Sequence, residues 1–97
     1  MIVRYTPSAL AHLAEVRAYI ALERPATARE IGQRIREAVT RLADFPHTGR
    51  TGRVEGTREL VIPRLPYIVV YLVSAEHVDV LAILHGARRW PSSFDAQ

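Results

Sequence analysis

The chain has no cysteine and no lysine, and each absence limits what it can be. Without cysteine there is no disulfide framework and no thiolate metal site. No apolar run approaches the roughly 20 residues that a membrane-spanning helix needs. The N-terminus, MIVRYTPSAL, lacks the basic segment and long apolar stretch of a signal peptide. We therefore expect a protein that does not enter a membrane and stays in the cytoplasm.

All 13 basic residues are arginine, and they outnumber the 10 acidic residues to give a formal net charge of +3. A guanidinium binds carboxylates and phosphates through two parallel hydrogen bonds and keeps its proton. The surface therefore suits an acidic partner, either a protein or a nucleic acid, although a GC-rich genome would also favour arginine. The length of 97 residues and the apolar fraction of 48% predict one folded domain over residues 1–97.

Hydrophobic periodicity predicts a pair of helices near the N-terminus. A β-rich run at 2–6 precedes Thr6-Pro7, an N-cap residue followed by proline at the first helical position. The first helix is expected over 7–22, with an apolar stripe formed by Leu10, Leu13, Val16 and Ile20. The second is expected from residue 25 to about residue 44. The short break between them predicts an antiparallel helical hairpin.

The second half of the chain is predicted to form a sheet. Residues 46–57, PHTGRTGRVEGT, have no periodicity and carry three glycines, which indicates a loop. Apolar runs predict strands over 57–62, 66–74 and 77–85, and YIVVYLV is apolar on both faces, as a central strand would be. The predicted fold is α+β with the order β-α-α-β-β-β, a helical hairpin packed on a small, mainly antiparallel sheet.

The glycine-rich loop and the strand after it contain Gly49-Arg50, Gly52-Arg53 and Arg58. Glycines let backbone amides turn toward an anion, and arginines add positive charge. The segment is not a nucleotide P-loop, because the glycine spacing differs and the lysine is missing. Arg50 and Arg53 are candidates for contact with an anion or a nucleic acid, unless the segment is an ordinary flexible loop beside a strand.

The last predicted strand ends in HGARRWP, which carries His85, Arg88, Arg89 and Trp90. His85 is either a structural hydrogen-bonding group at a strand end or a general acid or base. The arginines could steady a pentacoordinate phosphate. Trp90 either caps the edge of the core or offers a stacking surface for a base. The four histidines of the chain stand at no metal-ligand spacing, so we expect neither a metal nor another cofactor.

Several short motifs follow one another along residues 2–91. They are Tyr5-Thr6-Pro7, Pro46-x-x-Gly49-Arg50, Gly56-Thr57-Arg58-Glu59-Leu60, Pro66-Tyr67-x-x-x-Tyr71 and Ile83-Leu84-His85-Gly86-Ala87-Arg88. As an ordered set they resemble the RelE/ParE family, the toxin halves of bacterial type II toxin–antitoxin pairs. The resemblance implies the fold given above and one of two activities. RelE-like members cut messenger RNA in the ribosomal A site, and ParE-like members poison DNA gyrase without known chemistry of their own.

The chain departs from the pattern of the ribonucleases. Those members place basic side chains on the second strand and just after the tyrosine of the third, where this chain has Glu59, Val61 and Ile68. A carboxylate at position 59 would repel a scissile phosphate. Their tails also tend to end with a catalytic tyrosine or histidine, whereas this tail gives a tryptophan. The resemblance therefore favours the ParE-like branch, a gyrase inhibitor associated with plasmid stabilization. The expected target contacts are Arg58, His85, Arg88, Arg89 and Trp90.

Two alternatives stay open. A ribosome-dependent endoribonuclease would use His85 as acid or base, with Arg58, Arg88 and Arg89 steadying the transition state. A decayed member would be non-toxic and would only bind its antitoxin. All three hypotheses predict a cognate antitoxin, small, acidic and carrying its own DNA-binding domain, that forms a hetero-oligomer with this chain. The helical hairpin and the sheet edge are expected to offer its groove.

Overall fold

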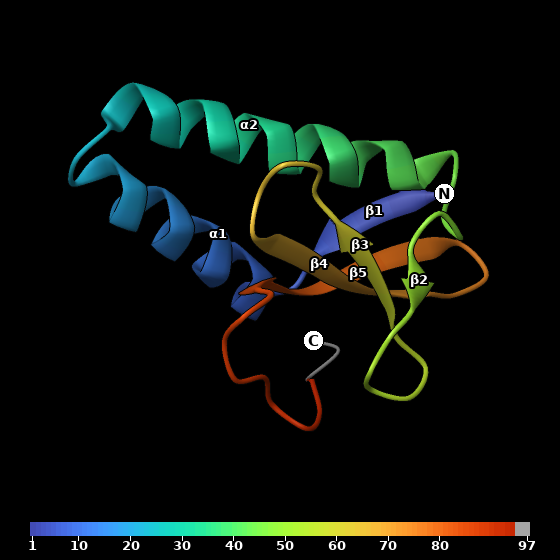
Figure 1. Ribbon diagram of the computed structural model, residues 1–97. Coiled ribbons are helices and arrows are strands. Elements are labelled where there is room, and N and C mark those ends of the chain that lie inside the picture. Colours follow the sequence, from blue (N-terminus) through green and yellow to red (C-terminus); the bar gives the residue numbers. More distant parts are fainter. Residues whose placement is uncertain (95–97) are drawn as a thin grey trace.

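A computed structural model describes residues 1–94 of the chain (Figure 1). Strand β1 (Ile2–Tyr5) leads into helices α1 (Pro7–Ala21) and α2 (Pro25–Thr40), and a 3-10 turn η1 (Arg41–Ala43) extends the second helix. Strands β2 (Arg50–Thr51), β3 (Arg58–Val61), β4 (Tyr67–Val73) and β5 (His77–His85) follow. The predicted α+β class and order of elements are confirmed, with β2 as an addition.

The strands form one mixed sheet in the order β1-β5-β4-β3-β2. β1 runs parallel to β5, and the other neighbours are antiparallel. β4 is the middle strand, as its two apolar faces predicted. Figure 1 shows both helices on one side of the sheet and the C-terminal tail on the other. Among the described residues, no helix has the length and apolar character needed to cross a membrane.

The prediction that residues 46–57 form only a loop is wrong in one detail. Arg50 and Thr51 pair with Glu59 and Arg58 in an antiparallel ladder. Two residues are too few for an alternating pattern to appear in the sequence, so periodicity could not reveal this strand. The preceding turn is anchored from the core: the buried Tyr71 hydroxyl donates to the Pro46 carbonyl and accepts from the Gly49 amide, each at 2.8 Å.

Helix α1 begins where the capping signal predicted, because the Thr6 hydroxyl accepts a hydrogen bond from the Ala9 amide at 3.1 Å. The predicted apolar stripe is wrong at its first member. Leu10 is 52% exposed, whereas Ala9, Leu13 and Val16 are buried. The buried stripe starts one residue earlier because Ala9 lies on the same face as Leu13 and Val16. A large apolar side chain is thereby left on the outer surface of the helix.

Candidate functional site

The second half of β5 is an open strand edge. β1 pairs with β5 only along 77–80, so residues 81–85 continue beyond the end of β1. The N-terminal turns of α1 take over there. The Thr6 amide donates to the Val80 carbonyl at 3.0 Å, and the Ile83 amide donates to Nδ1 of His12 at 3.2 Å. The N-cap backbone and a side chain of α1 therefore satisfy part of a strand edge that β1 does not cover.

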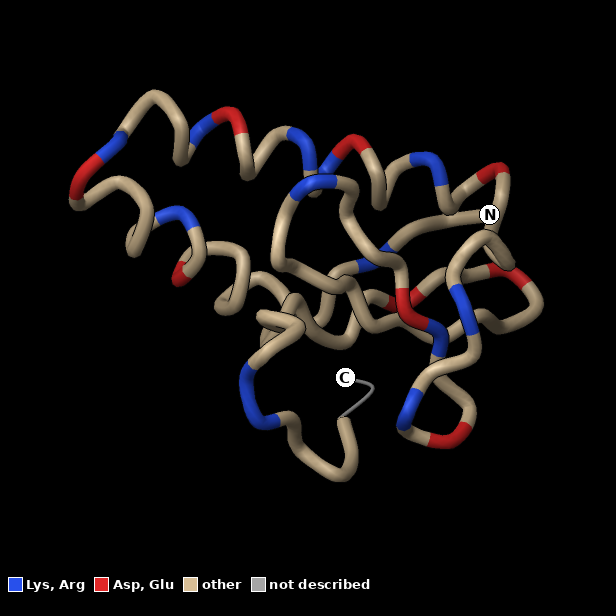
Figure 2. Tube along the Cα trace, in the orientation of Figure 1, with Lys and Arg blue, Asp and Glu red and all other residues tan. Residues whose placement is uncertain are grey.

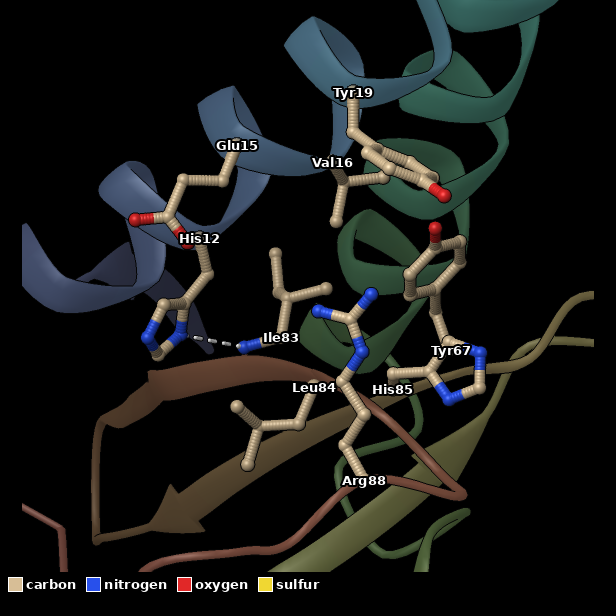
Figure 3. A pocket seen from close by; sticks show the side chains of 9 residues that line it. All are labelled: His12, Glu15, Val16, Tyr19, Tyr67, Ile83, Leu84, His85 and Arg88. Carbon is tan, nitrogen blue, oxygen red and sulfur yellow. Dashed lines mark hydrogen bonds between the residues drawn. The ribbon is translucent and has the colours of Figure 1, made fainter.

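A pocket of about 340 Å³ lies between α1 and this edge of β5 (Figure 3). Helix α1 supplies one wall, and the ends of β4 and β5 with the first residues of the tail supply the other. The lining residues are His12, Glu15, Val16, Tyr19, Tyr67, Ile83, Leu84, His85 and Arg88. Two of the residues predicted as functional, His85 and Arg88, therefore share one cavity.

The two imidazoles of the pocket are fixed through the same ring atom. His12 Nδ1 accepts from the Ile83 amide, and His85 Nδ1 accepts from the Ala87 amide at 3.1 Å. A neutral histidine that accepts at Nδ1 carries its proton on Nε2. The ring of His85 also meets Tyr67 edge-on, with 5.8 Å between the centroids. Both imidazoles are thus set as hydrogen-bond donors, which suits an anionic or carbonyl-bearing ligand group.

Arg88 extends over the pocket beside the side chains of Tyr19 and Tyr67 (Figure 3). Arg88 and Arg89 are exposed, and neither guanidinium forms an ion pair or hydrogen bond with any residue of 1–94. No group of three potential metal ligands exists in the described part of the chain, although His12, Glu15 and His85 line one cavity. The arrangement offers cationic and neutral donors to a partner.

The two arginines of the predicted anion-binding loop are bound to a carboxylate of this chain. Glu59, only 2% exposed, accepts from Nε and Nη2 of Arg50 at 3.2 and 3.0 Å. Those two bonds end on Oε1. The other oxygen, Oε2, accepts from the Arg53 amide at 2.7 Å and lies 3.7 Å from Nε of Arg53. The expected repulsive carboxylate at position 59 is therefore surrounded by positive charge.

Arg58 does not lie with His85 and Arg88. Its guanidinium donates to the Gly49 carbonyl at 2.8 Å, which places it on the turn before β2. Arg58 stands opposite Tyr71 on β4, whereas His85 stands opposite Tyr67. Four residues of strand correspond to about 13 Å. The five predicted contact residues thus do not form one cluster, because Arg58 lies apart from His85 and Arg88.

Trp90 is half-buried and is held by two contacts within the chain. Its indole nitrogen donates to the His85 carbonyl at 3.0 Å, and the Arg53 guanidinium lies 3.7 Å from the ring centroid. The stacking partner of the ring is therefore an arginine of this chain.

Sequence reasoning missed His12, Glu15 and Tyr19 as pocket residues. Their spacing of three and four places them on one face of a helix. That pattern could have marked the face, but nothing in it shows that the open edge of β5 lies opposite.

Comparison with known proteins identifies the class of protein that this fold and site define. The sequence model of a family described as "ParE toxin of type II toxin-antitoxin system, parDE" matches residues 3–90. "Putative toxin Y4kP" from Sinorhizobium fredii (strain NBRC 101917 / NGR234) is 42% identical over 89 residues, covering 92% of each chain. "Toxin RelE2" from Caulobacter vibrioides (strain ATCC 19089 / CIP 103742 / CB 15) is 34% identical over 84 residues, covering 87% of this chain and 93% of its own length.

A solved structure titled "Chromosomal ParDE TA system from P. aeruginosa" superposes with a TM-score of 0.78 at 27% identity, covering 86% of this chain and 92% of that one. The chain belongs to the RelE/ParE family and is a toxin of a type II toxin–antitoxin system. Membership also implies an antitoxin as its partner.

Proposed function

We propose that this toxin stops growth by binding DNA gyrase, as a ParE-like inhibitor without chemistry of its own, acting in the cytoplasm. The observation that carries the proposal is the contrast between Glu59 and the tail. The carboxylate holds the two loop arginines in internal ion pairs, so they are not available to stabilise a cleaving phosphate. Arg88 and Arg89 make no such pair within 1–94 and are available for a macromolecular target.

Purified gyrase tests the proposal directly. We expect the toxin to inhibit supercoiling at micromolar concentration and to trap a cleaved DNA complex. Replacing Arg88 and Arg89 together with alanine should abolish both effects. Arg29→Ala, an exposed arginine on α2, is the matched control and should inhibit like the wild type. Unaffected supercoiling without trapped cleavage at the same toxin concentration contradicts the proposal.

The antitoxin is proposed to cover the outer surface of the helical hairpin. Leu22 is 83% exposed and Tyr19 67% exposed, an unusual amount of apolar surface for one solvent-facing helix and the turn after it. A groove between the helices adds Ala14 and Ala28, with Arg17 and Arg29 also lining it. Small apolar residues flanked by guanidiniums suit an acidic amphipathic segment of a small antitoxin that carries its own DNA-binding domain.

A binding measurement with the cognate antitoxin tests this surface. Leu22→Asp should weaken the complex, because it puts a carboxylate where apolar burial and an acidic partner are expected. Glu23→Gln, next to it in the chain, should leave affinity unchanged. Equal affinities for the wild type and Leu22→Asp contradict the assignment of the surface, whatever the toxin's target proves to be.

A second candidate function is a RelE-like, ribosome-dependent endoribonuclease, favoured by the 34% identity to "Toxin RelE2". His85 would then serve as the acid or base, with Arg88 beside it in the pocket. Arg58 is held by the Gly49 carbonyl instead. Primer extension on translated messages after induction would show A-site cuts if this alternative holds. Continued growth on induction without the antitoxin would indicate a non-toxic member.

A further inference from the structure

Glu59 is a buried charge on the face of the sheet that the helices do not cover. Its neighbour Leu60 packs against the core cluster that contains residues of both helices. Successive side chains of a strand point to opposite faces, so Glu59 points away from the helices. The C-terminal tail lies on this same side of the sheet (Figure 1). Figure 2 shows the positive segments of the tail and of the β2–β3 connection on that side.

The two oxygens of Glu59 serve different arginines. Oε1 accepts both hydrogen bonds from Arg50, and Oε2 faces the amide and Nε of Arg53. Arg50 neutralises the carboxylate from one side, which leaves the other oxygen for Arg53. The Arg53 side chain is 49% exposed, so it reaches the solvent side of this contact.

Arg53 in turn reaches the tail. Its guanidinium carbon lies 3.7 Å from the centroid of the Trp90 ring. Within residues 1–94, the hydrogen bonds of residues 87–94 all end on His85: from the Ala87 amide, the Arg88 amide and the Trp90 indole. Those bonds shape the turn after β5 but do not attach it to the rest of the sheet. The Gly86 amide, at the start of the turn, donates to the Pro66 carbonyl at 2.7 Å. Beyond Gly86, the Arg53–Trp90 cation–π contact attaches the tail to the β2–β3 connection.

We infer that Glu59 is a positioning residue for the C-terminal tail, acting through Arg53 and Trp90. The carboxylate holds Arg53 in the orientation that packs against the indole. The indole is thereby held beside Arg53, and this fixes the path of residues 87–90, which include Arg88 and Arg89.

Trp90 is the one tryptophan of the chain, so its fluorescence reports the tail alone. Glu59→Gln keeps the shape of the side chain and removes its charge. We expect the indole to become more accessible to acrylamide, with an approximately fivefold larger population of the detached tail, the value that follows from losing one partly solvated cation–π contact. Glu55→Gln, an exposed carboxylate of the same connection, is the control and should leave the quenching unchanged.

Arg53→Lys provides the second variant, since it keeps the charge but loses the planar stacking surface. It changes a half-exposed side chain, so it remains informative if Glu59→Gln fails to fold. Wild-type quenching in a folded Glu59→Gln protein, or in folded Arg53→Lys, overturns the inference. Increased quenching in both, with circular dichroism unchanged, supports it.

A consequence for inhibition rests on the proposed function. If the tail binds gyrase, Glu59→Gln should weaken inhibition while binding of the antitoxin to the hairpin is retained. A detached tail with full inhibition would contradict the proposed role of Arg88 and Arg89 and leave the Glu59 inference standing. Unchanged quenching would contradict the Glu59 inference itself. The two failures are therefore distinguishable in one set of variants.

Discussion

The arginines before β3 and the arginines after β5 look alike in the sequence but have different surroundings. Arg50 and Arg53 surround the carboxylate of Glu59, which is 2% exposed. Arg88 and Arg89 are exposed and make no ion pair with any residue of 1–94. Charge and residue type are the same in both regions. What differs is whether a carboxylate of residues 1–94 lies within reach, and this decides which guanidiniums we propose are available to a partner.

Replacing Arg88 should have the largest effect of these variants. It should lower the affinity for the proposed target and leave the stability of the fold unchanged. Arg88→Ala removes a charge that forms no ion pair with any residue of 1–94, so stability should stay within about 0.5 kcal/mol. Affinity for the proposed target should fall by about 2 kcal/mol, or about thirtyfold. Calorimetric titration with gyrase and urea unfolding measure the two quantities. Arg50→Ala should show the reverse pattern, and equal patterns for the two variants would remove the distinction between the regions.

The Tyr71 hydroxyl should come next, because it anchors the turn that carries Arg50. Tyr71→Phe leaves the Gly49 amide and the Pro46 carbonyl without their partner, so the protein should lose about 1 to 2 kcal/mol of stability. Tyr67→Phe is the matched control, since the Tyr67 hydroxyl makes no hydrogen bond within 1–94. The urea concentrations at which the two variants are half unfolded measure this loss of stability. The anchoring role is refuted if both variants unfold at the same urea concentration.

Arg58 tests whether an arginine predicted to contact the target instead supports the fold. Arg58→Ala removes the hydrogen bond to the Gly49 carbonyl and should cost about 1 kcal/mol of stability. Arg89→Ala, the exposed counterpart in the tail, should unfold like the wild type. Gyrase inhibition by folded Arg58→Ala should be normal. A specific loss of inhibition at full stability would return Arg58 to the target-binding surface.

The smallest effect is expected from Arg4, an arginine that is paired but exposed. Its hydrogen bonds to Asp79, the shorter at 2.7 Å, lower the pKa of that carboxyl below the ordinary 3.8, with the positive charges of Arg4 and His77 adding to the shift and burial opposing it. A lowered folded-state pKa gives stability that is present above the unfolded value and lost as pH falls through the folded one. Arg4→Gln should therefore show a smaller decrease in stability as the pH falls below about 4. Urea midpoints over that acidic range measure it, and parallel pH curves for the two proteins would contradict it.

Most of the fold could be predicted from local patterns. The Thr6-Pro7 cap, the two helices and the three apolar strands each have a sequence signal that acts within a few residues. The features that local patterns do not predict correctly depend on distant parts of the chain. β2 exists because Arg50 and Thr51 pair with β3, and the buried face of α1 was assigned one residue too late at Leu10.

The candidate site was only partly predictable for the same reason. His85 and Arg88 are three residues apart, so their proximity followed from the strand end. Arg58 shares their positive or basic character, but the register of β4 places it four residues further along that strand than His85. His12 and Tyr19, which complete the pocket, come from a helix about 70 residues earlier in the chain, as the His12–Ile83 separation of 71 residues shows.

The sequence alone determined the order of helices and strands, the arginine-only basic surface and the likeness to a family of toxins. These properties depend on side-chain type and on spacing along the chain. Only the tertiary structure decided which arginines are available for a partner. The Coulomb attraction between a guanidinium and a carboxylate depends on their distance in space. That distance, for Glu59 and for the tail, is set by strand pairing and by the path of the chain across the sheet.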